Sequence, residues 1–161
     1  QRGVVSVGNP SCFCFNEFCF GATSEDTLKM MSGNTLARSS QNEKKDRMAC
    51  IVQMMLRQRS FFPFYPPPPS INLHSPNLRK TQLSQNSPDV LFLASDLKPF
   101  VKEIDGVLCV NTGRLTRGPG GGTYAHLTIH PYPEDKLKEA EEGKGLPHLA
   151  CERIKVEITR I

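Results

Sequence analysis

The amino-acid sequence predicts a mixed fold of the α/β (α+β) class, and three patterns lead to that prediction. Two short apolar runs, at 90–93 and 106–110, have the length of buried strands and are followed by turn residues. Apolar residues within 48–56 recur at the spacing of one helical face. Polar and apolar side chains alternate along 124–130, as they do in a strand with one face in water.

Length and composition indicate one domain. A chain of 161 residues falls in the usual range of a single domain, roughly 100 to 200 residues. The formal net charge of +4 does not by itself predict nucleic-acid binding, whose usual signature is a clustered basic patch. There is no charged-then-apolar leader and no apolar run near the roughly 20 residues of a membrane span. Because the chain begins with Gln1 rather than Met, we expect it to be a piece of a longer polypeptide.

The first part of the chain predicts a hairpin followed by a short helix. The β-branched run at 4–7 favours a short strand. The segment "SCFCFNEFCFG", residues 11–21, predicts two apolar strands joined at Asn16-Glu17. A capping pattern at 23–26 then precedes apolar residues at helical spacing, so a short helix should follow the hairpin.

The middle of the chain predicts a surface loop, a core helix and an extended proline-rich segment. Residues 37–47 are polar, and Ser40 is a candidate cap for the helix that follows. The apolar face of that helix consists of Met48, Ile51, Val52, Met55 and Leu56. The segment "SFFPFYPPPPS", residues 60–70, should end the helix because proline lacks an amide donor. We expect its aromatic side chains to pack along their own domain, since each gains roughly 1.5–3 kcal/mol on burial. Residues 70–87 favour an exposed loop.

The last part of the chain predicts two further strands and a short helix. Tyr124, His126, Thr128 and His130 alternate with apolar residues, which favours a half-buried strand. The charged segment "PEDKLKEAEEGKG" follows two prolines and predicts a short helix. The final "ERIKVEITRI" alternates again and predicts a strand at the end of the chain.

The six cysteines do not form a regular framework. Their spacing and the lack of a secretory leader predict a reducing compartment. Cys12 and Cys14, with Cys19 nearby, suggest zinc ligands, but no second pair follows at metal spacing and His74 is distant. The favoured interpretation is that Cys12 and Cys14 share one strand face as small buried apolar residues.

Three further groups of residues are candidate sites. The glycine-rich 118–123 connection lacks the Lys-Ser/Thr end of a phosphate loop and predicts a turn. Arg114 and Arg117 flank that region and are candidate partner-binding residues. His126 and His130 would share one strand face and could bind a metal, although an exposed polar face explains them more simply.

A family resemblance joins several of these segments. The segments "NPSCFCFNEFCFGATSEDTLKMM", "QRSFFPFYPPPP" and "PDVLFLASDLKPFVKEIDGVLCVNTGRLTRGPGGGTYAHLTI" together resemble the carboxyl-terminal part of the B-subunit family of DNA polymerase alpha. The resemblance covers about 4–129, and "KVEITRI" resembles the family's end. It implies a calcineurin-like metallophosphoesterase β-sandwich flanked by helices, of which 1–161 would form the C-terminal half. The other half and an oligonucleotide-binding domain would lie upstream, and 132–147 would be a variable charged insertion.

The resemblance also implies that the metal site of active relatives is lost. Those relatives hold two metal ions with a late His-Gly pair and a Gly-His-x-His turn. Gly21 occupies the place of the late histidine, and Ser95 and Leu97 occupy those of the two histidines of the turn. Glycine and leucine offer no lone pair, and serine is a poor substitute for neutral imidazole. Asp96 alone cannot hold two metals, so no metal, cofactor or catalytic residue is expected.

The function implied is that of a non-catalytic accessory subunit in nuclear DNA replication. Such a subunit would bind the zinc-containing C-terminal domain of the polymerase alpha catalytic subunit, would be linked to primase, and would meet DNA indirectly and no membrane. One alternative is an active metal-dependent phosphoesterase or nuclease that uses Asp96, His126 and His130. Another is a proline-motif ligand acting through "FYPPPP", which predicts that 61–69 are mobile and protease-sensitive.

Overall fold

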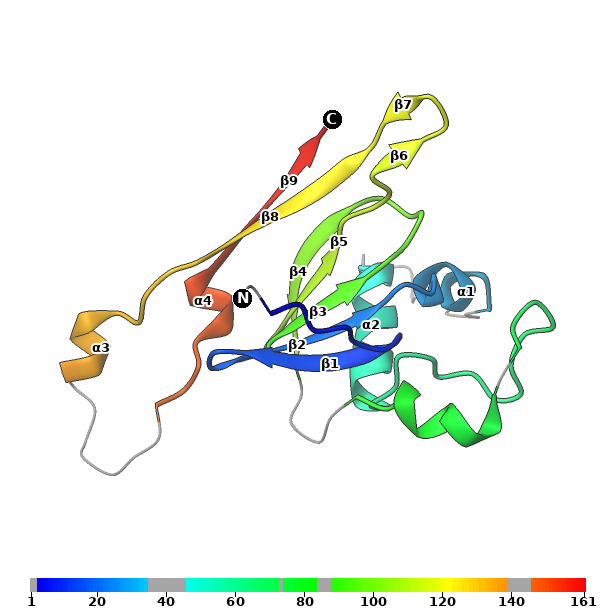
Figure 1. Cartoon of the computed structure of the whole chain (residues 1–161), viewed down its shortest axis with the longest axis horizontal. Helices are drawn as coiled ribbons and strands as arrows, with labels where there is room; N and C mark the ends of the chain where they lie inside the picture. Colours follow the sequence, from blue (N-terminus) through cyan, green and yellow to red (C-terminus); the bar gives the residue numbers. More distant parts are fainter. Residues whose placement is uncertain (1–2, 35–45, 73, 84–87, 139–145) are drawn as a thin grey trace, which may run out of the picture.

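The protein, here a computed structural model, is described over residues 3–34, 46–72, 74–83, 88–138 and 146–161. Its centre is a five-stranded sheet in the order β1-β2-β3-β5-β4 (Figure 1). The strands are β1 (Ser11–Phe15), β2 (Phe18–Thr23), β3 (Val90–Leu93), β4 (Phe100–Ile104) and β5 (Val107–Asn111). The three central strands are parallel, while β1 and β4 pair antiparallel at the two edges. The mixed α/β class is therefore confirmed.

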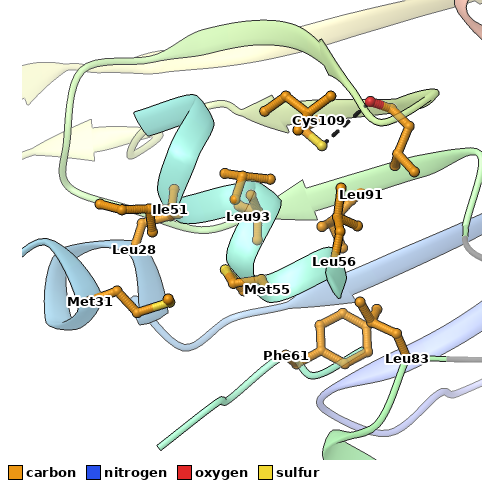
Figure 2. Packing of buried hydrophobic residues seen from close by; sticks show 13 residues of the cluster. Leu28, Met31, Ile51, Met55, Leu56, Phe61, Leu83, Leu91, Leu93 and Cys109 are labelled. Carbon is orange, nitrogen blue, oxygen red and sulfur yellow. Dashed lines mark hydrogen bonds between the residues drawn. The ribbon is translucent and has the colours of Figure 1, made fainter. Parts of the chain in front are cut away.

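Two helices, α1 (Thr27–Asn34) and α2 (Arg47–Arg57), contribute side chains to the core on one face of this sheet. Asp46 caps the start of α2, and its side chain accepts hydrogen bonds from the amides of Met48 and Ala49. The predicted apolar stripe of α2 is confirmed, and Figure 2 shows its residues packed against β3 and Phe61. Ser40, the predicted cap, lies outside the described residues.

The other sheet face carries a second cluster. A two-stranded ribbon of β8 (Thr123–Ile129) and β9 (Ile154–Arg160) begins beside the short helix α4 (Ala150–Arg153), and Figure 1 shows it extending beyond the main sheet. Both predicted C-terminal strands are confirmed. The buried residues of this cluster are Phe18, Phe20, Val90, Leu108, Val110, Ala150 and Ile154. The sheet thus has apolar side chains on both faces, which explains the continuous apolar runs of β3 and β5.

Several elements were missed by sequence reasoning. They are β4, the 3-10 helix η1 (Ser75–Thr81), the small strands β6 (Thr116–Arg117) and β7 (Gly120–Gly121), and α4. For β4 the signal was present, because Asp105-Gly106 is a hairpin turn sequence. Both turn residues have positive φ, 49° and 78°, as such a turn requires. The predicted charged helix exists as α3 (Glu134–Lys138).

Two predictions about the N-terminal region were wrong. Residues 4–7 form no strand and are exposed. Cys12 and Cys14 are also exposed rather than buried, because β1 is an edge strand and its residues from Cys12 onward face solvent. Cys14 forms a disulfide with Cys19, its direct partner across the hairpin. The hairpin itself is confirmed, with Asn16 in its turn at a φ of 52°.

The proline-rich segment packs on the domain at its start and leaves it at its end. Phe61 is 1% exposed, and its amide donates to the carbonyl of Thr81. Phe62 and Phe64 are half-buried, whereas Tyr65 is 89% exposed. The expectation of packing is confirmed for the phenylalanines and wrong for Tyr65. Within the described ranges no helix has the length and apolar character needed to span a membrane.

Arg153 attaches the C-terminal part of the chain to the β1–β2 hairpin. Its side chain is buried and donates to the carbonyl oxygens of His130 and His148, each at 3.2 Å. Its Nη2 also lies 2.6 Å from Glu17 Oε1 in the hairpin turn. The guanidinium carbon is 4.7 Å from the ring centroid of Phe18, a cation–π distance. One side chain thus joins three segments that are distant in sequence.

Arg153→Ala is expected to lower the free energy of unfolding by about 2 kcal/mol, since two carbonyl groups lose the buried guanidinium as a donor, at about 1 kcal/mol each. The change can be measured by urea denaturation followed by circular dichroism. Arg160→Ala is the matched control: this residue lies exposed on β9, and its loss should change stability by less than about 0.5 kcal/mol. Equal effects of the two substitutions would contradict the role of Arg153.

Candidate functional site at the strand ends

The carboxyl ends of β2, β3 and β5 lie at one edge of the sheet because these strands are parallel and adjacent. Thr23 pairs with Leu93, so the residues that follow β2 and β3 leave the sheet side by side. The loops after these strands contain Asp26, Asp96 and Arg114. In open α/β sheets this is the edge where sites are built, so a functional site of this protein is expected here.

Asp96 is the centre of the charged contacts at this edge. Arg114 makes a bidentate contact with it: Nη2 lies 2.7 Å from Oδ2, and Nε donates to Oδ1. Lys29 Nζ lies 3.5 Å from Oδ2, and Arg117 donates to the Asp96 carbonyl at 3.4 Å. The hydrogen bond from Arg114 is the largest cause that lowers the pKa of Asp96 from its usual value. The carboxylate is therefore held charged and is already compensated by cations of the chain.

Asp26 links the loop after β3 to the start of α1. Its Oδ2 accepts a hydrogen bond from the Asp96 amide at 2.9 Å, and its Oδ1 accepts one from the Lys29 amide at 3.0 Å. The second bond caps α1. Ser95 is buried, and its Oγ accepts from the Leu97 amide at 3.2 Å, which forms a local turn. The side chains of Asp26 and Ser95 therefore hold the backbone of the loop after β3 in place.

Asn111, fully buried at the end of β5, holds the same loop from the other side. Its Nδ2 donates to the carbonyl oxygens of Leu97 and Lys98 at 3.2 and 3.3 Å, and its Oδ1 accepts from the Gly113 amide at 3.1 Å. Sequence reasoning identified this turn but missed the roles of Asn111 and Asp26. The available signal was an asparagine two residues before a glycine, a pattern in which the side chain bonds the backbone two positions on.

Gly21 does not lie with the other predicted positions of the lost metal site. It pairs with Leu91 in the middle of β2, two residues before the strand ends, whereas Ser95 and Leu97 follow the end of β3. Its Cα faces the ring of Phe61, because a Cβ built there would be 3.3 Å from Phe61 Cζ. The structure therefore brings Ser95, Asp96 and Leu97 together and leaves Gly21 in the core.

His126 and His130 pair with residues of α4 and β9, not with the strand-end loops. His126 is exposed on β8 opposite Glu157, and His130 follows the strand, its amide donating to the Arg153 carbonyl. Over the ranges that the structure describes, no group of three or more His, Cys, Asp or Glu residues is arranged so that it could hold a metal ion. That finding covers the Cys12–Cys14–Cys19 cluster as well as Asp96 with His126 and His130.

Comparison with known proteins identifies the family. The sequence model of the family described as the B subunit of DNA polymerase alpha/epsilon matches residues 1–102, which is more than half of the chain. The chain belongs to this family. The matched part of this family member includes β1, β2, β3, both core helices and the 94–97 turn, so the resemblance drawn from those segments is confirmed.

The B-subunit family members most useful for comparison are curated proteins named as the B subunit of DNA polymerase alpha. That of Rattus norvegicus is 34% identical over 143 residues, covering 89% of this chain and 24% of the relative. That of Mus musculus is 34% identical over 161 residues, covering 100% and 25%. That of Schizosaccharomyces pombe is 33% identical over 159 residues, covering 95% and 27%. The chain thus spans about a quarter of the length of these relatives.

In this B-subunit family member the strand-end cluster is suited to hold loops in place. Its carboxylates accept from backbone amides and from side-chain cations, and its buried amide and hydroxyl groups bond the backbone of the same loops. Such networks rigidify a surface, because each buried polar group has a partner. Among the described residues, no buried side-chain nitrogen or oxygen lacks a hydrogen-bond partner.

Acid is expected to destabilise this B-subunit family member. A hydrogen bond from Lys102 lowers the pKa of Asp46, and one from Arg114 lowers that of Asp96, both from usual values of 3.8. Each folded-state pKa lies below the unfolded-state value, so the unfolded chain binds more protons as the pH falls. The stabilisation is present above about pH 5 and is lost as the pH falls through 3.8 and below.

The acid effect can be measured as the urea midpoint between pH 7 and pH 2.5. Asp46→Asn keeps a capping oxygen for α2 but removes the charge, so its midpoint should fall less steeply with acid than that of the unchanged protein. Arg160→Gln is the control, because this cation is exposed at the end of β9 and does not contribute to the lowered pKa of Asp46 or Asp96. An acid dependence that Asp46→Asn leaves unaltered would show that other groups cause it.

Proposed function

We propose that this chain is part of a non-catalytic accessory B subunit of the DNA polymerase alpha–primase complex, which acts in the initiation of DNA replication in the nucleus. The observation that carries the proposal is the similarity to proteins named as the B subunit of DNA polymerase alpha, at 33–34% identity over 89% to 100% of the chain. The family membership supports a role beside a polymerase, and the assignment to the alpha complex follows the names of these relatives.

The proposed fold is a calcineurin-like phosphoesterase sandwich, with 1–161 as its C-terminal half. Support comes from the mixed sheet, whose central strands are parallel, and from its two apolar faces. One face packs against α1 and α2, and the other against the α4 end of the ribbon. The upstream half and an oligonucleotide-binding domain would belong to the remaining three quarters of the subunit. Residues 132–147 would be a variable charged insertion.

The proposed lack of catalysis is supported by the chemistry of the strand-end residues. Leu97 offers no lone pair to a metal, and Ser95 Oγ already accepts from an amide of its own loop. Asp96 retains a carboxylate, but Arg114 and Lys29 compensate its charge. A divalent cation at Asp96 would have to displace these cations, so the edge favours a structural role.

The proposed partners are the catalytic subunit, bound through its C-terminal zinc domain, and the primase subunits held in the same complex. Arg114 and Arg117 remain the candidate contact residues. Both are exposed, and both reach Asp96, so their position is set by the strand-end loop. An arginine that is fixed in place loses little side-chain entropy when it binds a carboxylate of a partner.

The proposal is tested by co-purification of the full-length tagged subunit from nuclear extract, with partners identified by mass spectrometry and metals quantified in the same sample. Polymerase alpha catalytic and primase subunits are expected in near-stoichiometric amounts, and the B subunit separated from them should carry no divalent metal of its own. Arg114→Ala with Arg117→Ala should reduce recovery of the catalytic subunit, whereas Arg160→Ala should not.

Two results would overturn the proposal. One is recovery of the subunit without any polymerase or primase subunit. The other is a stoichiometric divalent metal together with hydrolysis of bis(p-nitrophenyl) phosphate that His126→Ala abolishes. The second result would establish the active phosphoesterase alternative and would place its site on the ribbon rather than at the strand ends.

A further inference from the structure

The excess of basic over acidic residues in the chain comes from one segment. Residues 47–88 hold five of the 20 Lys and Arg residues and none of the 16 Asp and Glu residues, so the rest of the chain carries one more acidic than basic residue. The same segment contains the aromatic run Phe61, Phe62, Phe64 and Tyr65. The small net charge of the whole chain therefore conceals a basic and aromatic stretch.

These residues surround two neighbouring hollows in the protein surface. The larger, of about 610 Å³, is lined by Arg59, Phe64 and Tyr65 together with residues of η1. The second, of about 280 Å³, is lined by Lys80 among others. Phe62, Leu78 and Thr81 line both hollows, so the two are neighbours beside η1.

The aromatic residues form a partly open platform. The ring centroids of Phe62 and Phe64 are 5.1 Å apart, and the ring planes are tilted by 57°. Tyr65 follows directly and is 89% exposed, which is unusual for a large ring in a segment whose first phenylalanine is buried. Flat rings presented at a surface hollow can stack on the bases of a nucleic acid.

Arg59 lies at a position where the backbone conformation is strained for any residue that has a side chain. It follows the last turn of α2 with a φ of 49°, a left-handed conformation in which glycine is the usual residue. The conformation is fixed by the bond from its amide to the Leu56 carbonyl and by the bond that its own carbonyl accepts from Leu83. Its guanidinium forms no ion pair or hydrogen bond with any other described residue. An arginine kept there at such a cost suggests a function for the charge.

We propose that this surface, made of Arg59, Phe62, Phe64, Tyr65 and Lys80, binds a single strand of nucleic acid. Bases stack on the exposed rings, and Arg59 and Lys80 face the phosphates. An acidic peptide would match the charge, but it offers a flat ring only where it carries an aromatic residue, whereas every nucleotide of a single strand carries a base beside a phosphate. The contact goes beyond the indirect relation to DNA proposed above, and it does not depend on which polymerase subunits the protein binds.

The test measures binding of a fluorescein-labelled 15-nucleotide deoxythymidine strand to the full-length protein by anisotropy at two salt concentrations. Tyr65→Ala should weaken binding about 5- to 100-fold, the effect of losing one stacked base. Arg59→Glu with Lys80→Glu should weaken it at least tenfold and reduce its salt dependence. Tyr124→Ala and Arg160→Ala, exposed residues of the ribbon, are the controls and should bind as the unchanged protein does.

Arg59→Gly separates binding from folding. Glycine suits the left-handed conformation, so this variant should unfold at the same or a higher temperature while it loses affinity for the strand. A 5-iododeoxyuridine strand should also form photo-crosslinks that mass spectrometry maps to Tyr65 or Phe64, which distinguishes this surface from other nucleic-acid sites of the full-length protein.

Three results would overturn the proposal. They are a full-length protein that does not bind the strand, Arg59→Gly and Tyr65→Ala variants that bind it unchanged, and crosslinks that map only outside 59–80. Co-purification with polymerase subunits would be unaffected by any of these results, so failure of this inference is distinguishable from failure of the proposed function. Binding of a fluorescein-labelled poly-glutamate peptide that Arg59→Glu with Lys80→Glu abolishes, in a protein that does not bind the deoxythymidine strand, would instead assign the surface to an acidic protein.

Discussion

Gly21→His is expected to destabilise the protein by roughly 4 kcal/mol and to create no metal site. A Cβ at this position would lie 3.1 Å from Leu91 Cδ1 and 3.3 Å from Phe61 Cζ, both tighter than ordinary contacts. The imidazole would extend further into the same packed face. Overpacking costs about 1–3 kcal/mol, and a buried ring nitrogen without a partner adds about 1–3 kcal/mol. A histidine at the position that the resemblance assigns to a metal ligand therefore should not create a metal site.

The loss is measured from urea unfolding curves, and metal binding from the manganese content after dialysis. Gly21→Ala is the matched control. It introduces the Cβ alone, which the end of the Leu91 side chain can accommodate by a small shift, so a cost of about 1 kcal/mol is expected. A histidine variant that unfolds like the unchanged protein and binds manganese would contradict both parts of the prediction.

Phe61→Ala is expected to lower the free energy of unfolding by about 4 kcal/mol, within the range for truncation of a buried phenylalanine. The Phe61 ring is 1% exposed and lies in the core between α2 and the sheet (Figure 2). The backbone of Phe61 also contributes a contact, because its carbonyl accepts a hydrogen bond from Thr27 Oγ1 at 2.9 Å. Tyr65→Ala, four residues later and almost fully exposed, should change stability by less than about 0.5 kcal/mol.

The effects of Gly21→His and Phe61→Ala on stability should be coupled, because the histidine and the Phe61 ring would compete for one space. With Phe61 reduced to alanine, a histidine at position 21 could turn into the space that the ring leaves. The double variant should thus lose less stability than the two single variants together, by about 1 kcal/mol or more. Strict additivity would mean that Phe61 is not what excludes a larger residue at Gly21.

Local sequence patterns predicted the helices and strands in which each face meets either the core or solvent along its whole length. β3 and β5 are short apolar runs because apolar residues cover both faces of the central sheet, and α2 has a single apolar stripe because one side of it meets the core. The alternation in β8 reflects one face toward the second cluster and one toward solvent. In each case a residue's neighbours in sequence are enough to show its burial.

Burial that depends on distant segments was not predictable in this way. Both β1 and β2 contain Phe and Cys side chains, but β1 lies at the sheet edge, so Cys12 and Cys14 are exposed while Phe20 is buried. At the candidate site, sequence reasoning selected Asp96 and Arg114 separately, and only the parallel order of β3 and β5 brings them into contact. The burial of Arg153 likewise requires Glu17 from the other end of the chain.

The order of the strands also determines when the sheet can assemble. The β1–β2 and β4–β5 hairpins close over short turns and can form within microseconds. β2 and β3 are direct neighbours, yet the connection between them spans 24–89, and joining them requires the ends of that long loop to meet. Folding should therefore be slow relative to a helical domain of this size. On the ribosome, β2 has no parallel partner until β3 emerges, and during that interval its free edge is open to pairing with other chains.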